Sequence, residues 1–292
     1  MAGKTVETLI HEWLEDCILG VDPANHEQVI DALIRDQYQG GPTVMTAISS
    51  VEIAFWDILG KDCGRPVFEL LGGRCRDRLP AYANGWYGGA RTPAQYAEAA
   101  REVIAIAREY PGLKLDPFGT AWQEMSEEQM GAAEAIVAAV RFAIGSEKEL
   151  LIEGHGRLLP ECAILRGRRL EKYHPTLFEE PVSPSDWDGL LAVRRGTNIP
   201  LAAGERIYAE EEFMRFIRLN AVSLLQPDLS HCGGLRMSRR IAEAAAQAGI
   251  RLSPHVSVGP VALCAALHFG FSCPAVWMQE NFAAYDVPWR HE

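Results

Sequence analysis

The stretches Leu151–Glu153 (LIE), Leu177–Glu179 (LFE) and Leu201–Glu205 (LAAGE) decide the fold of this chain. Each is a short apolar run that ends in a glutamate, and these glutamates follow one another at equal steps of 26 residues (179 − 153 and 205 − 179). A strand, a helix and two short loops occupy about that much chain, so the spacing indicates consecutive βα units. Parallel strands in such units point the same way, which predicts that the three carboxylates meet at one rim.

Acidic or imidazole side chains continue the series beyond the third glutamate. Asp228, His255 and Glu280 each follow a further apolar run. Polar groups at six successive strand ends are typical of an active site on the C-terminal face of a barrel. Eight predicted strands, separated by amphipathic helices, predict a (β/α)8 barrel, and they lie near residues 79–84, 112–116, 149–153, 176–179, 200–204, 222–226, 251–255 and 275–280.

The first 75 residues differ from the rest because their apolar side chains recur at helical spacing. A helix over residues 43–59 is too apolar for a free surface. The sequence also predicts where helices of the barrel begin. Ser126–Gln129 is a capping box, and helices are expected to start at Gly233-Gly234 after strand 6 and at Gly259-Pro260 after strand 7.

Composition restricts the class of protein. The net charge of −11 disfavours nucleic acid and anionic membranes as partners, and the 48% hydrophobic content is ample for a core. Seven cysteines without a CxxC pair indicate reduced thiols rather than disulfides. No apolar run reads as long enough to span a bilayer, and the N-terminus has no apolar signal region. We therefore expect a soluble, cytoplasmic protein.

The three glutamates predict a magnesium site. Carboxylates that converge with no basic residue among them would repel one another unless a hard cation lay between them. Hard oxygen ligands without cysteine or histidine favour Mg²⁺ over zinc. A single glutamate could equally cap the following helix, but three at equal steps make that reading the weaker one. Alternation along a strand allows only one of Glu179 and Glu180 to point into the barrel mouth, so we expect Glu180 to form a structural ion pair.

Two further positions could carry acid–base chemistry. Asp228 and His255 end adjacent strands, so the carboxylate could hold the imidazole in one tautomer and make it a general base. His155 lies two residues beyond Glu153, and alternation predicts that both side chains share a face. Lys114 and Asp116 share a face for the same reason, and they bind substrate or pair with each other.

These motifs together resemble the enolase superfamily, and within it the mandelate racemase subgroup. The resemblance covers about residues 5 to 282 and rests on Trp56-Asp57, Leu70-Leu71-Gly72-Gly73, Glu153, Glu179-Glu180-Pro181, Gly204-Glu205-Arg206, Gln226-Pro227-Asp228, Gly233-Gly234 and Pro254-His255. The motif Glu153-x-His155-Gly156-Arg157 further resembles the acid-sugar dehydratases, such as galactonate dehydratase.

The resemblance implies roles for the site residues. Glu153, Glu179 and Glu205 would bind one Mg²⁺ ion, which holds the substrate carboxylate and stabilises the enediolate left by removal of the α-proton. The His255–Asp228 pair would be the base and His155 the acid that expels the β-hydroxyl. Glu280 would hydrogen-bond the enediolate. The product would be a 2-keto-3-deoxy acid made from an aldonic or aldaric acid.

Two departures from the family pattern affect this expectation. Racemases of the subgroup carry Lys-x-Lys on strand 2, but here the motif is Lys114-Leu115-Asp116, which disfavours a two-base racemase and leaves Lys114 as an alternative base. The family also begins with a β-meander and ends with a return to the capping domain. We therefore expect a partial helical capping domain over residues 1–75, a catalytic barrel over 76–282 and a truncated tail over 283–292.

Two alternatives to a dehydratase stay open. One is a cycloisomerase or epimerase that uses the same proton abstraction, and the other, suggested by the apparent truncation, is a catalytically silent barrel. Without the meander, we expect Val51, Phe55 and Ile58 to form an exposed apolar patch on the 43–59 helix. Such a patch promotes association, which predicts a homo-oligomer.

Overall fold

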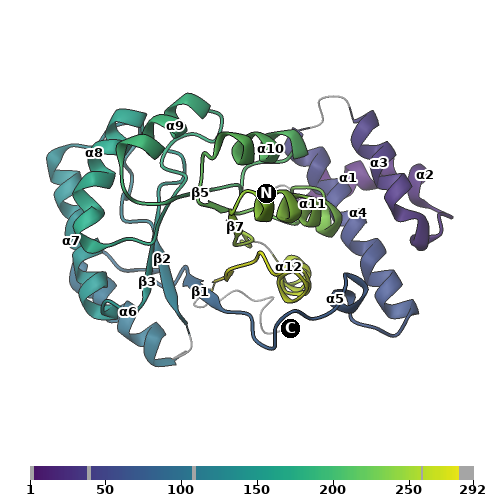
Figure 1. Cartoon of the computed structure of the whole chain (residues 1–292), viewed down its shortest axis with the longest axis horizontal. Helices are drawn as coiled ribbons and strands as arrows, with labels where there is room; N and C mark the ends of the chain where they lie inside the picture. The colour runs from purple at the N-terminus through teal and green to yellow at the C-terminus, as the bar shows by residue number, and fades with distance from the viewer. Residues whose placement is uncertain (1–2, 38–40, 107–109, 258, 283–292) are drawn as a thin grey trace.

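The computed structural model describes residues 3–37, 41–106, 110–257 and 259–282. A group of N-terminal helices lies on one side of a barrel of strands surrounded by helices (Figure 1). The predicted boundary at residue 75 falls between α5 (Val67–Leu70) and β1 (Ala81–Asn84). The predicted C-terminal tail, residues 283–292, lies outside the described residues.

The barrel is built from eight strands whose neighbours all pair in parallel, in the order β7-β6-β5-β4-β3-β2-β1-β8. Leu252 closes the ring because it forms a parallel bridge with Val276, just before the last strand. The predicted (β/α)8 barrel is therefore confirmed. The strands are β1, β2 (Gly112–Leu115), β3 (Glu149–Glu153), β4 (Leu177–Glu179), β5 (Leu201–Ala203), β6 (Leu224–Leu225), β7 (Arg251–Leu252) and β8 (Gln279–Phe282).

Helices follow the strands and cover the outside of the barrel (Figure 1). Ser126 caps α7 as predicted: its hydroxyl accepts from the Gln129 N–H at 3.1 Å, and the Gln129 side chain accepts from the Ser126 N–H at 2.9 Å. Gly233 and Gly259 precede helices at the predicted places. The helices are α6 (Pro93–Ile106), α7 (Glu127–Ile144), α8 (Pro160–Leu170), α9 (Trp187–Gly196), α10 (Glu210–Leu219), α11 (Gly234–Gln247) and α12 (Pro260–Ser272).

The N-terminal helices form a second apolar core. It contains Leu14, Ile30, Leu33 and, from α4, Ile48 and Phe55. The elements before α5 are α1 (Gly3–Leu9), the π-helix η1 (Ile10–Leu14), α2 (Glu15–Ile18), the 3₁₀ helix η2 (Pro23–Asn25), α3 (His26–Asp36) and α4 (Gly41–Asp62).

The expected apolar patch on α4 is mostly covered. Val51 and Phe55 are buried, because the helices that precede α4 fold back over this face. Ile58 remains 48% exposed, and Leu19 beside it is 68% exposed. The prediction is therefore wrong for Val51 and Phe55 and right for Ile58. A smaller apolar groove remains at this end of α4.

Helix α4 also corrects the expectation that no apolar run could span a bilayer. Over the part of the chain that the structure describes, it is the one helix long and apolar enough to do so. Its polar side chains instead contact the barrel: the Ser49 hydroxyl accepts from the Gly233 N–H, and Glu52 accepts from the N–H groups of Leu235 and Arg236, each at 2.8 Å. Helix α4 is therefore packed between the N-terminal helices and α11.

Candidate active site

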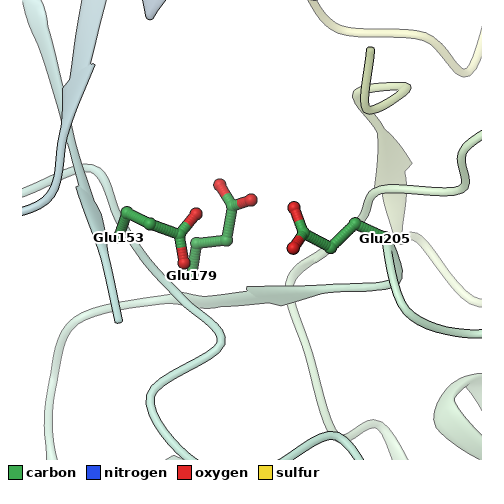
Figure 2. Close-up of side chains that lie close together, drawn as sticks. All are labelled: Glu153, Glu179 and Glu205. Carbon is green, nitrogen blue, oxygen red and sulfur yellow. The ribbon is translucent and has the colours of Figure 1, made fainter. Parts of the chain in front are cut away.

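Glu153, Glu179 and Glu205 converge as the spacing predicts. One carboxylate oxygen from each lies within 4.8 Å of the other two. Figure 2 shows the carboxylates pointing toward one another across the mouth of the barrel. Glu153 and Glu179 end neighbouring strands and are register partners, and both are buried. Three acidic groups held this close are a candidate cation site.

Glu205 reaches the group by a different route from the other two. Glu179 pairs with Ala202 across β4 and β5, so Glu205 lies beyond the end of its strand, after Gly204. Gly204 has a φ of +144°, and a Cβ there would lie 2.8 Å from the backbone nitrogen of Gln226. Because only glycine tolerates this approach, the Gly204-Glu205 pair turns the chain and returns the carboxylate to the rim.

Lys114 lies among the carboxylates, so the expectation that no basic residue lies among them is wrong. It is 1% exposed, and its Nζ lies 2.7 Å from Glu280 Oε1, 2.8 Å from Glu179 Oε1 and 3.4 Å from Glu153 Oε2. The interpretation that Lys114 and Asp116 pair with each other is therefore wrong. Burial opposes the charged ammonium, but Glu179 and Glu280 hold the pKa of Lys114 well above its usual value.

The negative charge of the clustered glutamates still exceeds the positive charge that Lys114 supplies. Glu153 Oε2 is buried and makes no hydrogen bond within the described residues, although Lys114 is near it. Burial and the neighbouring Glu179 raise the pKa of Glu153 well above its usual value. Burial also opposes ionisation of Glu179, but Lys114 lowers its pKa. A buried carboxylate oxygen without a partner is costly, so this arrangement suits an additional cation.

His255 and Asp228 form the hydrogen-bonded pair that their strand positions predict. His255 Nδ1 lies 2.8 Å from Asp228 Oδ2, and Nε2 lies 3.2 Å from Glu205 Oε2. The Ser230 N–H and hydroxyl bind Asp228 Oδ1 at 2.8 and 2.5 Å. Burial opposes the imidazolium, but Glu280, Asp228 and Glu205 raise the pKa of His255 to about 10. The geometry fits a base fixed at Nδ1, whose role stays a prediction.

Glu280 lies on β8 and is fully buried. Its Oε1 accepts from Lys114 and, at 2.9 Å, from the Asn84 amide, while Oε2 accepts from the Val256 N–H at 3.1 Å. Oε2 is 3.9 Å from His255 Nε2. Both oxygens have protein partners, so Glu280 links Lys114 to the end of β1 and to the loop after β7. Its expected hydrogen bond to the enediolate stays a prediction. Asn84 was missed, although it also ends a predicted strand.

His155 reaches the rim, but not by strand alternation. Strand β3 ends at Glu153, and His155 has a left-handed φ of +49°. Its N–H donates to Glu153 Oε1 at 2.6 Å, and its Nδ1 lies 2.8 Å from Asp116 Oδ2. The His155 side chain is 50% exposed. The assumed geometry was therefore wrong, and the structure identifies Asp116 as the partner that sequence reasoning did not assign.

The predicted structural ion pair of Glu180 is confirmed. Arg206 Nε donates to Glu180 Oε2 at 2.8 Å, and Nη2 binds the same oxygen. Burial and Glu205 raise the pKa of Glu180 to about 7, while the hydrogen bond from Arg206 opposes this shift. Glu180 thus supports the site from outside the group of three glutamates.

Comparisons with known proteins agree with this architecture. Residues 95–292 match the enolase C-terminal domain-like family, and residues 2–72 match the N-terminal domain of mandelate racemase/muconate lactonizing enzymes. The chain therefore belongs to the mandelate racemase/muconate lactonizing enzyme family of the enolase superfamily. The crystal structure of a mandelate racemase/muconate lactonizing enzyme from Jannaschia sp. CCS1 superposes with a TM-score of 0.90 and 32% identity, covering 99% of this chain and 76% of that one.

Similar curated proteins include two sugar-acid dehydratases. The D-galactonate dehydratase of Klebsiella pneumoniae (strain 342) is 39% identical over 290 residues, which cover 97% of this chain and 73% of that protein. The D-gluconate dehydratase of Thermoproteus tenax is 37% identical over 247 residues, which cover 85% of this chain and 49% of that protein. This chain thus spans about half to three quarters of these relatives.

Proposed function

We propose that the chain is a Mg²⁺-dependent hydro-lyase that dehydrates an aldonic or aldaric acid to a 2-keto-3-deoxy acid. The observation that carries this proposal is the convergence of Glu153, Glu179 and Glu205 beside two histidine–aspartate pairs on one rim. The similarity to D-galactonate and D-gluconate dehydratases supports a sugar acid as the substrate.

The three glutamates fit a hard divalent cation. They offer oxygen ligands only, and Glu153 Oε2, which lies 3.4 Å from Lys114 Nζ and makes no hydrogen bond within the described residues, provides a ligand atom. Bound Mg²⁺ would supply positive charge to the substrate carboxylate and so acidify the neighbouring C–H bond.

His255 is suited to remove the α-proton. Asp228 holds its Nδ1, so Nε2 is the nitrogen that can take the α-proton. Nε2 lies near Glu205 and Glu280, which favour the imidazolium. A cation bound by Glu205 would weaken this effect and favour the neutral imidazole that a base requires. His155 is suited to protonate the departing β-hydroxyl. The C–O bond then breaks, water leaves, and the electrons of the former C–H bond form the C=C bond of an enol. The enol becomes the 2-keto acid when it gains a proton at carbon and loses one from oxygen.

The contacts on strand β2 favour this reaction over a two-base racemisation. Lys114 is held by carboxylates at 2.7 and 2.8 Å, and position 116 carries an aspartate that binds His155. Neither is free to act as a second base opposite His255. A cycloisomerase or epimerase that uses His255 alone is the alternative enzyme, and a silent barrel is the non-enzymatic one. We further propose a cytoplasmic homo-oligomer.

A screen of sugar acids in deuterated water with Mg²⁺ tests the proposal. D-Galactonate and D-gluconate are the first substrates, and the measurements are 2-keto acid formation and deuterium at the α-carbon of the recovered substrate. We expect a 2-keto acid from at least one substrate. The His255→Asn variant should lose α-proton exchange, and His155→Asn should keep exchange but lose dehydration. Exchange that persists in His255→Asn would assign the base to Lys114. Exchange without 2-keto acid would indicate an epimerase, and the absence of both exchange and 2-keto acid would indicate a silent barrel.

A further inference from the structure

Asp116 lies at the end of β2 and accepts hydrogen bonds from three directions. Its Oδ2 is 2.8 Å from His155 Nδ1 and 2.5 Å from Arg157 Nη2, and its Oδ1 accepts from the Phe118 N–H at 3.0 Å. Burial opposes ionisation, but the hydrogen bond from His155 and the charge of Arg157 hold the pKa of Asp116 below its usual value. Asp116 is therefore a fixed carboxylate with one oxygen directed at the imidazole.

Arg157 ties Asp116 to the rim. Its guanidinium also donates to the carbonyl oxygens of Gly119, at 2.5 Å, and Gly154, at 3.2 Å. These contacts link the loop after β2 to the loop after β3. An aspartate anchored in this way can hold a neighbouring ring in one orientation at little further entropic cost.

The backbone around His155 is also constrained. A Cβ at Gly154 would lie 2.7 Å from the Glu180 carbonyl, and Gly156, with a φ of +63°, would clash with the Arg206 side chain. The two glycines therefore allow this turn to lie against the loop after β4, where the Glu179 and Glu180 carbonyls accept from the Gly154 and Gly156 N–H groups, and His155 between them is left-handed. The backbone of the turn fixes the position of the His155 side chain, and the contact with Asp116 fixes the orientation of its imidazole ring.

We propose that Asp116 is the positioning residue of His155, which it holds at Nδ1 so that Nε2 is the nitrogen presented to substrate. This inference rests on the proposed function, and it deepens that function by assigning the two reaction steps to two histidine–aspartate pairs. His255–Asp228 removes the α-proton, and His155–Asp116 protonates the departing hydroxyl. The two pairs have the same 2.8 Å contact between Nδ1 and Oδ2.

The first test is the tautomer of His155 in the protein without substrate or metal. Free neutral imidazole favours the Nε2–H form, whereas a carboxylate at Nδ1 selects the Nδ1–H form. ¹⁵N spectra of labelled histidine at alkaline pH distinguish the two, and the His155→Gln variant identifies the His155 signals among the eight histidines. We expect Nδ1–H in the wild type and a shift toward Nε2–H in Asp116→Asn. Unchanged ring-nitrogen signals in Asp116→Asn would overturn the proposal.

The second test separates the two steps. Asp116→Asn should retain α-proton exchange and lose dehydration by about 100-fold or more, because general acid catalysis contributes about 10²–10⁴-fold. Asp116→Glu should restore part of this loss, and Asp228→Asn should lose exchange and dehydration together. Equal loss of exchange and dehydration in Asp116→Asn would overturn the proposal.

Arg157→Gln is the matched control for the alternative that Asp116 only links the loops after β2 and β3. It loosens the same two loops but leaves the Asp116 carboxylate able to accept from His155. We expect its His155 signals to stay in the Nδ1–H form, and equal tautomer shifts in Arg157→Gln and Asp116→Asn would assign Asp116 a structural role only. A wild type that neither exchanges the α-proton of any sugar acid nor forms a 2-keto acid would overturn the proposed function alone, because the tautomer still tests the pairing of Asp116 with His155.

Discussion

Two buried glutamates, Glu52 in the helical region and Glu153 in the barrel mouth, have opposite surroundings. Glu52 is fully buried, and its carboxylate accepts from the Trp56 indole and from the N–H groups of Leu235 and Arg236, each at 2.8 Å. Glu153 is 2% exposed, yet its Oε2 makes no hydrogen bond within the described residues, and two other carboxylates lie near it. The two carboxylates are similarly buried, but both oxygens of Glu52 accept hydrogen bonds, whereas Glu153 Oε2 accepts none within the described residues.

We propose that the difference separates a structural carboxylate, Glu52, from one that binds a ligand, Glu153. Glu52 occupies the N-terminus of α11, where free N–H groups and the helix dipole stabilise a negative group, so its partners are complete. Glu153, Glu179 and Glu205 are held together by the barrel with Lys114 as the neighbouring cation. An incomplete set of partners for a buried charge indicates that a ligand completes it.

The largest expected effect is on activity, in Glu153→Gln. If the glutamates hold a catalytic cation worth several kcal/mol of transition-state stabilisation, turnover should fall by about 10³-fold or more. The fold should survive without metal, because the amide has the same shape and removes repulsion with Glu179. Steady-state kinetics and thermal melting in EDTA check both halves. If Glu153→Gln keeps its turnover, or unfolds without metal, Glu153 would not differ from Glu52 as a ligand-binding glutamate differs from a structural one.

The next effect is on stability, in Glu52→Ala. The substitution strands the Leu235 and Arg236 N–H groups in the α4–α11 interface, so we expect a loss of about 3 kcal/mol in the free energy of unfolding. Urea unfolding measures it. The exposed Glu102 on α6 supplies the control, since Glu102→Ala should change stability by no more than about 0.5 kcal/mol. Similar losses in the two variants would mean that the Glu52 contacts contribute little.

The pH dependence of stability sharpens the same comparison. Burial raises the pKa of Glu52 to about 7, against the hydrogen bonds that favour its ionised form. The folded protein then binds a proton that the unfolded chain releases above its ordinary carboxylate pKa. This contribution to stability is complete below about pH 4.5 and is lost as the pH rises through about 7. Glu52→Gln should flatten this slope in urea titrations at several pH values, and an unchanged slope would exclude Glu52 as its source.

The smallest effect on folding is expected at the apolar groove beside α4. Ile58 is 48% exposed, so Ile58→Lys should change the free energy of unfolding by no more than about 0.5 kcal/mol. If this groove drives association, the variant should shift the protein toward monomer in light scattering. Val51→Lys is the contrasting change, because Val51 is buried and a charge there should destabilise the fold. An oligomeric state that is unchanged in Ile58→Lys would exclude the groove as an interface.

The sequence predicted features that depend on local pattern and strand direction. The barrel, the meeting of Glu153, Glu179 and Glu205, and the His255–Asp228 contact all follow from where strands end. Prediction from the sequence failed where contacts between distant segments decide the local conformation or the burial of a side chain. The turn at His155 is set by the loop after β4, and the burial of Val51 and Phe55 is set by the preceding helices. No local signal shows that Lys114 reaches across to Glu280 on β8.

We propose that Glu153, Glu179 and Glu205 bind one divalent cation. A crystal of the protein soaked in Mn²⁺, with Glu153→Gln as the matched control, tests this proposal. We expect a single anomalous peak among the three carboxylates in the wild type and none at that position in Glu153→Gln. An empty wild-type site at saturating Mn²⁺, with Lys114 still in contact with Glu153 and Glu179, would show that the lysine alone neutralises the glutamates and would contradict the account.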